Sequence, residues 1–328
     1  MKYYSAIDLH STNQYIAIID ENNVPVLQKR FPNRLEDALA AFEPYKDNIV
    51  GIAVESTYNW YWLVDGLIDN GYTLHLVNTA AVKSYSGLKH ADDKSDANWL
   101  AHLLLLGILP TGYIYPKEQR YIRDALRKRS QLVQIRTKML LSISSYYARH
   151  TGSKIATRQI YQSPQTCSFG NDWQQLVLGA NIHVFERLNQ EIRLIESTVL
   201  KRLKRTIDYE LLKTISGVGD ILAMTIALEV GNIKRFKAVG NFVSYCRRVD
   251  SKYLSNGKKK GQGNKRNGNR YLSWAYAEAA HFAIVHDACI KRYFERKRAK
   301  TNPMCAIGAV AHKLARASYF MMRDKVPF

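Results

Sequence analysis

The sequence predicts an α/β N-terminal domain on a mixed β-sheet, then a long helical arm, then a mainly α-helical C-terminal domain. Strand-like alternation begins within the first residues and gives way to alternating helix and strand patterns. Two long stretches in the middle of the chain carry apolar residues at helical spacing. After about residue 208, short helical patterns are separated by glycines. We place the domains at residues 1–116, 117–207 and 208–328.

The N-terminal domain has the element order of a mixed sheet. Residues 3–31 contain three strand-like segments joined by short polar turns, as in an antiparallel meander. Helices and strands then alternate, with helices at 35–46, 59–70 and 94–107 and strands at 49–56 and 72–78. An antiparallel meander followed by alternating helices and parallel strands is typical of an RNase H-like sheet.

Two amphipathic stretches predict the helical arm. Residues 117–149 and 172–207 carry apolar residues in steps of three and four, with charged residues on the other face. Residues 151–171 are rich in Ser, Thr, Gln and Gly and are expected to form the connecting loop. Packing of the two helices within one chain and association between chains explain the apolar stripes equally well.

Charge and composition restrict the class of protein. The 328 residues carry 48 Lys and Arg against 28 Asp and Glu, a formal net charge of +20, and 46% are hydrophobic. In a compact fold so many positive charges repel one another, so a polyanionic partner is the simplest explanation; a merely soluble basic protein is the alternative.

With no apolar signal segment and no run of 18 apolar residues, we expect a cytoplasmic protein without a membrane partner. The four separated cysteines suit neither a zinc site nor a disulfide framework.

Four acidic residues lie where a metal site is expected. Asp8 lies inside the first strand, where an ionised side chain is unfavourable unless it is paired or binds a metal. Glu55 ends a buried strand, at the sheet edge where ligands bind in such folds. Asp93 and Asp96 stand three apart at the start of a helix and project from one face. Together they are suited to hold two Mg²⁺ ions, or Mn²⁺ in their place, for phosphoryl transfer.

Each carboxylate also has an ordinary structural explanation. Asp93 and Asp96 are suitable as the N-cap and third residue of their helix. Asp8 could pair with a lysine, and Glu55 could be a solvated strand end. The metal-site hypothesis rests on the order Asp, Glu, Asp-x-x-Asp, with each residue in the matching element of an RNase H-like fold.

Two features of the C-terminal domain suit nucleic acid. Gly217-Val218-Gly219 joins two helical stretches, as in a helix-hairpin-helix whose backbone N–H groups approach a phosphate; a plain packing turn explains it equally well. Residues 247–270 carry nine cations against one Asp and are interrupted by glycines. They predict a mobile phosphate-contacting loop, with a solvated charge run as the alternative. The nine cations are Arg247, Arg248, Lys252, Lys258, Lys259, Lys260, Lys265, Arg266 and Arg270.

Ser255 lies in the middle of this basic segment. A serine hydroxyl surrounded by cations and backbone N–H groups can attack a phosphodiester, because the surrounding charge stabilises the transition state. Most loop serines have no such role, so the residues alone leave the question open.

The chain resembles the DEDD transposases of the insertion-sequence-110 family, also described as bridge-RNA-guided recombinases. The resemblance covers nearly the whole chain. It rests on Asp8 in AIDLH, Glu55 in VES, Asp93 and Asp96 in DKSDA, the ISGVG turn, the run from Ser255 through NGNRYLSWAYAEAA, and the ending AVAHKLARASYFMMR.

The resemblance implies a RuvC-like N-terminal domain that binds Mg²⁺ through the four carboxylates. It implies that the serine is a nucleophile that forms a covalent 5′-phosphoserine link. It also implies donor and target DNA as partners, a structured non-coding RNA that pairs with both, and a homo-oligomer, either dimer or tetramer.

Two departures from the family pattern affect the site. Ala91-Asp92 precede Asp93 where the family has Lys-Thr, although the Asp-Ala step at 96–97 favours Asp93 over Asp92 as ligand. The Tyr-x-Gly-Leu-x-Pro segment of the family is replaced at 245–250, which leaves Ser251 as an alternative nucleophile to Ser255.

Three functions therefore compete. The leading one is a transposase that cuts and rejoins donor and target DNA. A RuvC-like junction resolvase or nuclease would use only the carboxylates and water, which leaves the basic serine segment unexplained. A non-catalytic RNA- or DNA-binding protein would bind no metal. A covalent protein–DNA adduct separates the first function from the second, and metal binding separates both from the third.

Overall fold

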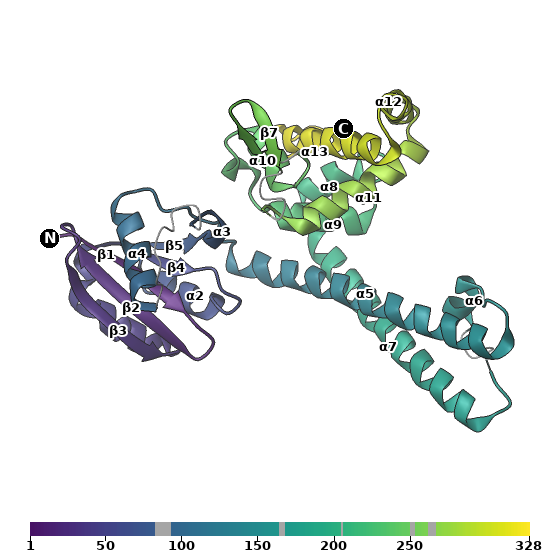
Figure 1. Cartoon of the computed structure of the whole chain (residues 1–328), viewed down its shortest axis with the longest axis horizontal. Coiled ribbons are helices and arrows are strands. Elements are labelled where there is room, and N and C mark those ends of the chain that lie inside the picture. The colour runs from purple at the N-terminus through teal and green to yellow at the C-terminus, as the bar shows by residue number, and fades with distance from the viewer. Residues whose placement is uncertain (83–92, 164–167, 205, 250–252, 262–266) are drawn as a thin grey trace. The chain divides into compact units, whose positions relative to one another are not determined.

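The computed structural model describes residues 1–82, 93–163, 168–204, 206–249, 253–261 and 267–328. It divides the chain into two compact units, Met1–Lys117 and Glu118–Phe328 (Figure 1). The predicted architecture is confirmed: a mixed sheet with helices comes first, long helices follow, and the remainder is helical. The division into three domains stays a prediction.

The N-terminal unit is built on a five-stranded sheet with the order β3-β2-β1-β4-β5. The meander β1 (Tyr3–Leu9), β2 (Asn13–Asp20) and β3 (Pro25–Pro32) is antiparallel. The strands β4 (Ile49–Glu55) and β5 (Leu74–Val77) run parallel to β1. The predicted RNase H-like order is therefore present. Its two central strands, β1 and β4, end at the same edge of the sheet.

Helices cover both faces of this sheet. One face carries branched side chains such as Ile7 and Val54 and packs with the apolar residues of α1 (Leu35–Phe42) and α2 (Tyr61–Asp69). A 3₁₀ turn at Glu43–Asn48 continues α1. The other face carries the small residues Ala6 and Ala53 and packs with α4 (Asp93–Leu105), while the short helix α3 (Thr79–Val82) follows β5. Small side chains let α4 approach the sheet closely, which brings its first turn near the strand ends.

The second unit begins with a pair of antiparallel helices, α5 (Lys117–Thr151) and α7 (Asp172–Leu203), as predicted for the arm (Figure 1). Arg129 pairs with Glu196 across them. The connecting segment is not purely a loop, because it contains the helix α6 (Thr157–Gln162). Its Ile160 is fully buried among apolar residues of α5 and α7, so tertiary packing gives this polar stretch its helix.

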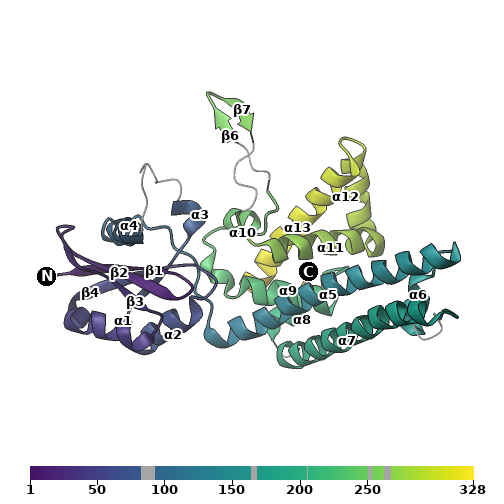
Figure 2. The same ribbon diagram turned by 60° about the horizontal axis from the view of Figure 1, so that its bottom comes forward.

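The remaining helices share one core. They are α8 (Ile207–Lys213), α9 (Asp220–Val230), the 3₁₀ turn Ile233–Arg235, α10 (Val239–Tyr245), α11 (Arg270–His286), α12 (Ala288–Arg298) and α13 (Pro303–Asp324). Leu126, Val199 and Leu203 of the arm join that core. A two-stranded hairpin, β6 (Tyr253–Ser255) and β7 (Lys258–Gly261), is inserted between α10 and α11 (Figure 2).

Two expectations from composition concern the whole chain. Among the described residues, no helix is long and apolar enough to cross a membrane. Cys246 is buried while Cys289 and Cys305 are exposed, and all three are free thiols. Cys167 lies outside the described residues.

Candidate active site

The carboxylates Asp8 and Glu55 lie on the face of the sheet that α4 covers. Side chains alternate along a strand, so Asp8 shares the face of Ala6 and Glu55 shares the face of Ala53. Ala6 pairs with Ala53 and Ile7 with Val54 in the parallel register, which sets Asp8 beside Glu55. Asp8 is 4% exposed and Glu55 is half-buried. Two adjacent carboxylates therefore lie beneath the first turn of α4.

The electrostatics of Glu55 show that the carboxylates are close together. The pKa of Glu55 is raised to about 7, first because burial removes water from the carboxyl. A hydrogen bond with Asp8 and the negative charges of Asp8 and Asp96 raise this pKa further, and His10 lowers it. Burial and the nearby negative charges therefore both favour the protonated form of Glu55.

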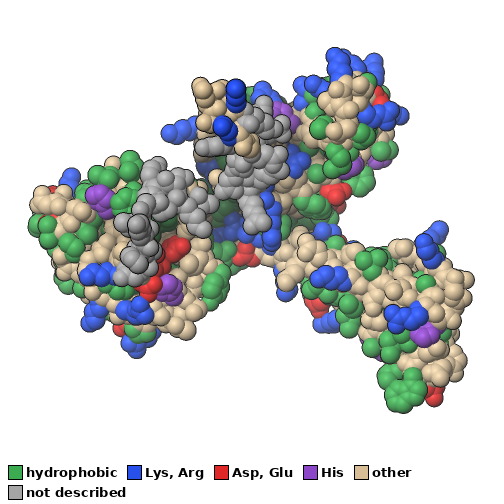
Figure 3. Space-filling model, viewed as in Figure 1, with side chains coloured by type: hydrophobic (Ala, Val, Ile, Leu, Met, Phe, Trp, Pro, Cys, Tyr) green, Lys and Arg blue, Asp and Glu red, His purple; other side chains and the backbone are tan. Residues whose placement is uncertain are grey.

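The structure brings Asp93 and Asp96 to the same place, at the start of α4. His10 Nε2 lies 3.3 Å from Asp8 Oδ2 and 3.2 Å from Asp93 Oδ1. The ligand atoms of Asp8, His10 and Asp93 all lie within 4.8 Å of one another, close enough to hold a metal ion. Figure 3 shows acidic side chains gathered on the N-terminal unit beside histidine and basic side chains. All four predicted carboxylates thus converge, while their role as ligands stays a prediction.

Two further residues, His10 and Arg30, lie at the cluster although the sequence did not predict them. His10 follows Asp8 by two residues, a spacing that places both on one face of an extended chain and could have indicated it. Arg30 of β3 donates a hydrogen bond to Asp93. It reaches that position because Asp8 pairs with Tyr15 and Tyr15 pairs with Arg30, so the three side chains form one row across the sheet. Only the register reveals that row.

The donor set fits a hard divalent cation. Carboxylate oxygens are the ligands that Mg²⁺ and Mn²⁺ prefer, and a partly buried group of four repels itself strongly without cations. In the protein itself, Arg30 and His10 offset part of that charge at Asp93. The cluster therefore has the ligand chemistry of a divalent metal site.

Ser255 lies at a hairpin turn, and the expected mobile loop is wrong for residues 253–261. Asn256 and Gly257 have φ values of 50° and 71°, and Ser255 pairs with Lys258 across them. Two left-handed residues form the turn that suits the twist of a tight hairpin. The Asn-Gly step is a strong hairpin signal, although it lies inside a dense run of charge. Ser255 is exposed on this turn.

The nine cations do not share one environment. Lys258, Lys260 and Arg270 are exposed. Arg247, at φ 55°, instead donates from Nε to the carbonyl oxygens of Asn267 and Gly268. Lys259 lies in β7.

Arg248 is turned into the fold. It donates a hydrogen bond to Ser273, and its carbonyl oxygen lies 2.8 Å from His312 Nδ1. Arg247 and Arg248 therefore bind residues of the surrounding fold at the start of the basic segment. The described residues do not include five that the sequence analysis names: Ser251, Lys252, Lys265, Arg266 and Asp92.

The two glycines of the α8–α9 turn differ in their surroundings. Gly217 has φ +88°, and a Cβ there would lie 2.5 Å from the backbone nitrogen of Ala283 in α11. It is therefore required for helix packing. Gly219 precedes α9, and a Cβ there would meet no atom within 4 Å. The assignment of phosphate binding to either glycine stays a prediction.

Comparisons with known families cover most of the chain. Residues 6–146 match the family model of the DEDD transposases of the IS110 type, described as a transposase. Residues 209–295 match a second model, described as the transposase IS116/IS110/IS902 family. The first match contains the four carboxylates and the second contains Ser255. No curated protein matches the chain.

Proposed function

The chain belongs to the IS116/IS110/IS902 family of transposases, and we propose that it cuts and rejoins donor and target DNA with two Mg²⁺ ions and a serine nucleophile. Asp8, Glu55, Asp93 and Asp96 would hold the metal ions, with Mn²⁺ as a substitute. Metal ions at such a site neutralise charge on the oxygens of the reacting phosphate. The convergence of four carboxylates from three elements is the observation that carries this proposal.

In the proposed reaction Ser255 attacks the scissile phosphorus. The bond from Ser255 Oγ to phosphorus forms as the bond from phosphorus to the 3′ oxygen breaks. The hydroxyl loses its proton and the released 3′ oxygen takes one up, leaving a 5′-phosphoserine link. Rejoining reverses these bond changes when the 3′ hydroxyl of another strand attacks that link. The exposed hairpin turn and the neighbouring Lys258 support this role, because a cation beside the hydroxyl stabilises charge on the phosphate.

A covalent-adduct assay tests the two halves of the proposal separately. Purified protein is incubated with end-labelled donor DNA and Mg²⁺, and adducts are resolved on a denaturing gel. Asp8→Asn and Ser255→Ala should each abolish the adduct while nucleic-acid binding persists. Asp47→Asn, at an exposed carboxylate outside the cluster, is the matched control and should leave the adduct unchanged.

The outcomes distinguish the competing functions. Strand cleavage by Ser255→Ala without an adduct would favour a nuclease that uses water. An adduct that survives Ser255→Ala but disappears in Ser251→Ala would reassign the nucleophile. Failure of Mg²⁺ to bind, measured by calorimetry, would favour a non-catalytic nucleic-acid-binding protein.

We also propose that a structured non-coding RNA guides the reaction, as the family resemblance implies. The large positive net charge supports a polyanionic partner in addition to DNA. Recombination between purified donor and target DNA should require RNA transcribed from the non-coding flank of the gene. Equal recombination without that RNA would refute the proposal.

The protein is further proposed to act as a homo-oligomer with a composite active site. The carboxylates and Ser255 lie in different compact units. The arm exposes the apolar side chains Trp173, Leu176 and Leu194, to 76%, 63% and 60%, which a second chain could cover.

A mixing experiment tests the composite site. A mixture of Asp8→Ala and Ser255→Ala proteins should recover recombination, with the adduct only on the Asp8→Ala chain. Co-assembly of the two proteins without recovery would place both halves of the site in one chain.

A further inference from the structure

A groove lies between α5 and the first turns of α11 in the C-terminal unit. Its volume is about 780 Å³, within the range of small-ligand sites. The side chains that carry the argument are Arg127, Lys128 and Arg129 of α5 and Arg270, Tyr271 and Trp274 of α11. The carboxylate cluster belongs to the other unit, so this groove is a separate feature.

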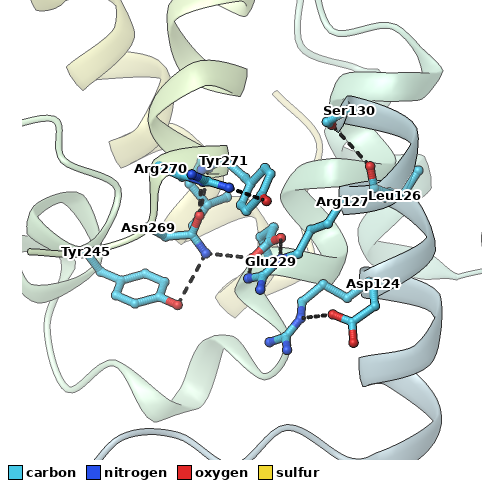
Figure 4. Close-up of polar contacts among 11 residues, drawn as sticks. Asp124, Leu126, Arg127, Ser130, Glu229, Tyr245, Asn269, Arg270 and Tyr271 are labelled. Carbon is cyan, nitrogen blue, oxygen red and sulfur yellow. Dashed lines mark hydrogen bonds and ion pairs between the residues drawn. The ribbon is translucent and has the colours of Figure 1, made fainter. Parts of the chain in front are cut away.

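A buried carboxylate fixes both walls of the groove. Glu229 of α9 is 2% exposed and accepts hydrogen bonds from Nε and Nη2 of Arg127, both at 2.7 Å. The same carboxylate accepts a third bond, also 2.7 Å, from Nδ2 of Asn269, the N-cap of α11 (Figure 4). Because α5 and the start of α11 share one buried partner, the groove is a preformed site.

Positive charge outweighs negative charge along the groove, whose lining includes one carboxylate, Asp124, at 3.8 Å from Nε of Arg123. Glu229 pairs with Arg127 and Glu196 pairs with Arg129, each at 2.7 Å. Lys128 and Arg270 are exposed, and within the described residues no carboxylate pairs with either. Lys128 donates to Gln131, and Arg270 donates to the Tyr271 hydroxyl. These two cations are therefore available to an anion.

The groove also carries a free aromatic face. The centre of the Tyr271 ring lies 4.8 Å from the Arg127 guanidinium and 4.9 Å from the Arg270 guanidinium. Trp274 lies one turn further along α11 and is 38% exposed. No ring or cation among the described residues packs on it. An exposed indole in the same groove as two cations that pair with no described carboxylate suits a flat ligand that bears a negative charge.

We propose that this groove binds an unpaired nucleotide of a single strand, with its base stacked on Trp274 and its phosphate contacting Lys128 and Arg270. Base stacking on an aromatic side chain combined with a cationic track is how proteins bind single strands. A duplex cannot use the indole in this way, because its bases are stacked on one another. The inference goes beyond the cleavage chemistry and rests only on the chain binding nucleic acid.

Binding to matched oligonucleotides tests the proposal. The probes are a single-stranded DNA of about 12 nucleotides, the RNA of the same sequence and the DNA duplex, all in EDTA to prevent cleavage. Trp274→Ala should weaken single-strand binding about tenfold and leave duplex binding unchanged. Trp274→Phe should retain most of the affinity. Phe282→Ala, at an aromatic side chain of α11 that is 50% exposed, is the matched control and should bind like the unchanged protein.

Two further measurements localise the ligand. A single 5-iodouracil in the strand should crosslink on irradiation to the peptide that contains Trp274. The double variant Lys128→Ala with Arg270→Ala should make the log–log salt slope shallower by roughly 0.7 for each phosphate of the single strand that it no longer neutralises. Lys138→Ala, at an exposed lysine of α5 outside the groove, should change the slope less than the double variant does.

Several outcomes would overturn the inference. Equal losses of affinity for single strand and duplex in Trp274→Ala, or no loss for either, would exclude base stacking, as would crosslinks only to other peptides. Tight binding of poly-glutamate that Trp274→Ala leaves intact would instead indicate an acidic protein ligand. The DNA and RNA arms show which strand the groove prefers. Asp8→Asn and Ser255→Ala should bind normally, so this proposal and the cleavage proposal can fail independently.

Discussion

Replacing Asn269 with Asp isolates the electrostatics of the groove wall with almost no change of shape. Oδ1 of Asn269 accepts hydrogen bonds from the amides of Tyr271 and Leu272, which caps α11. Nδ2 donates to Glu229 at 2.7 Å, and the residue is 6% exposed. In Asn269→Asp the cap is retained, but an oxygen replaces the amide NH₂ group that donates to Glu229.

The magnitude follows from that distance. Two full charges 2.7 Å apart repel by about 6 kcal/mol at an effective dielectric constant of about 20. Protonating the introduced carboxyl at pH 7 costs about 4 kcal/mol when its unfolded pKa is about 3.9. Protonation costs less than repulsion, and the protonated acid restores a hydrogen bond to Glu229. We therefore expect a destabilisation of about 4 kcal/mol at pH 7.

The pH dependence has a definite sign. In the variant the folded-state pKa of the introduced carboxyl lies above its unfolded value, so the unfolded state releases the proton first as pH rises. The penalty is absent below about pH 4 and grows by about 1.4 kcal/mol per pH unit up to the folded-state pKa. Asn302→Asp is the matched control, because Asn302 caps α13 through Cys305 and is exposed. A negative charge there lies at the positive end of the α13 dipole and should stabilise the folded protein by about 0.3–1 kcal/mol.

Native-state hydrogen exchange of the full chain measures these effects locally. Opening free energies of α11 peptides are compared between Asn269→Asp and the unchanged protein at pH 5 and at pH 8, with peptides of α1 as an internal reference. A loss of stability in Asn269→Asp smaller than about 1 kcal/mol at pH 7, or one that does not change with pH, would refute the reasoning. It would mean that the Glu229 carboxylate does not repel a carboxylate placed at the α11 cap.

Three further predictions use the same chain. Gly217→Ala should lower the opening free energies of α9 and α11, measured by hydrogen exchange, by more than about 3 kcal/mol. It places an alanine at a left-handed φ and adds a backbone clash. Gly219→Ala, in open space, should cost less than about 1 kcal/mol, and equal costs would contradict the packing role of the first glycine. Mg²⁺ at about 100 times its Kd should protect peptides of β1 and β4 by about 2.7 kcal/mol, and Asp8→Asn should remove that protection. Alanine at both Lys258 and Lys260 should flatten the salt dependence of duplex binding by roughly 0.9 for each phosphate that is no longer neutralised; an unchanged slope would place the phosphates elsewhere.

Local patterns in the sequence were sufficient for the order of elements and for the four carboxylates. Alternation identified β1 and β2, and helical spacing identified α5 and α7. The mobile loop predicted from the charge pattern was wrong for residues 253–261. The Asn256-Gly257 step there forms a hairpin turn. The short helix α6 was not predicted either, because the packing of its one buried residue, Ile160, rather than its polar sequence stabilises it.

The sequence by itself determined the class of fold and the residue types of the acidic cluster, and its net charge predicted a polyanionic partner, because periodicity and charge are local or additive properties. Tertiary structure alone decided that Arg30 joins Asp8 and Asp93, since strand register cannot be read from either strand separately. It also decided that Glu229 supports Arg127 and Asn269, residues 102 and 40 positions away. Interactions of that range depend on how helices pack, and no local pattern in the chain encodes them.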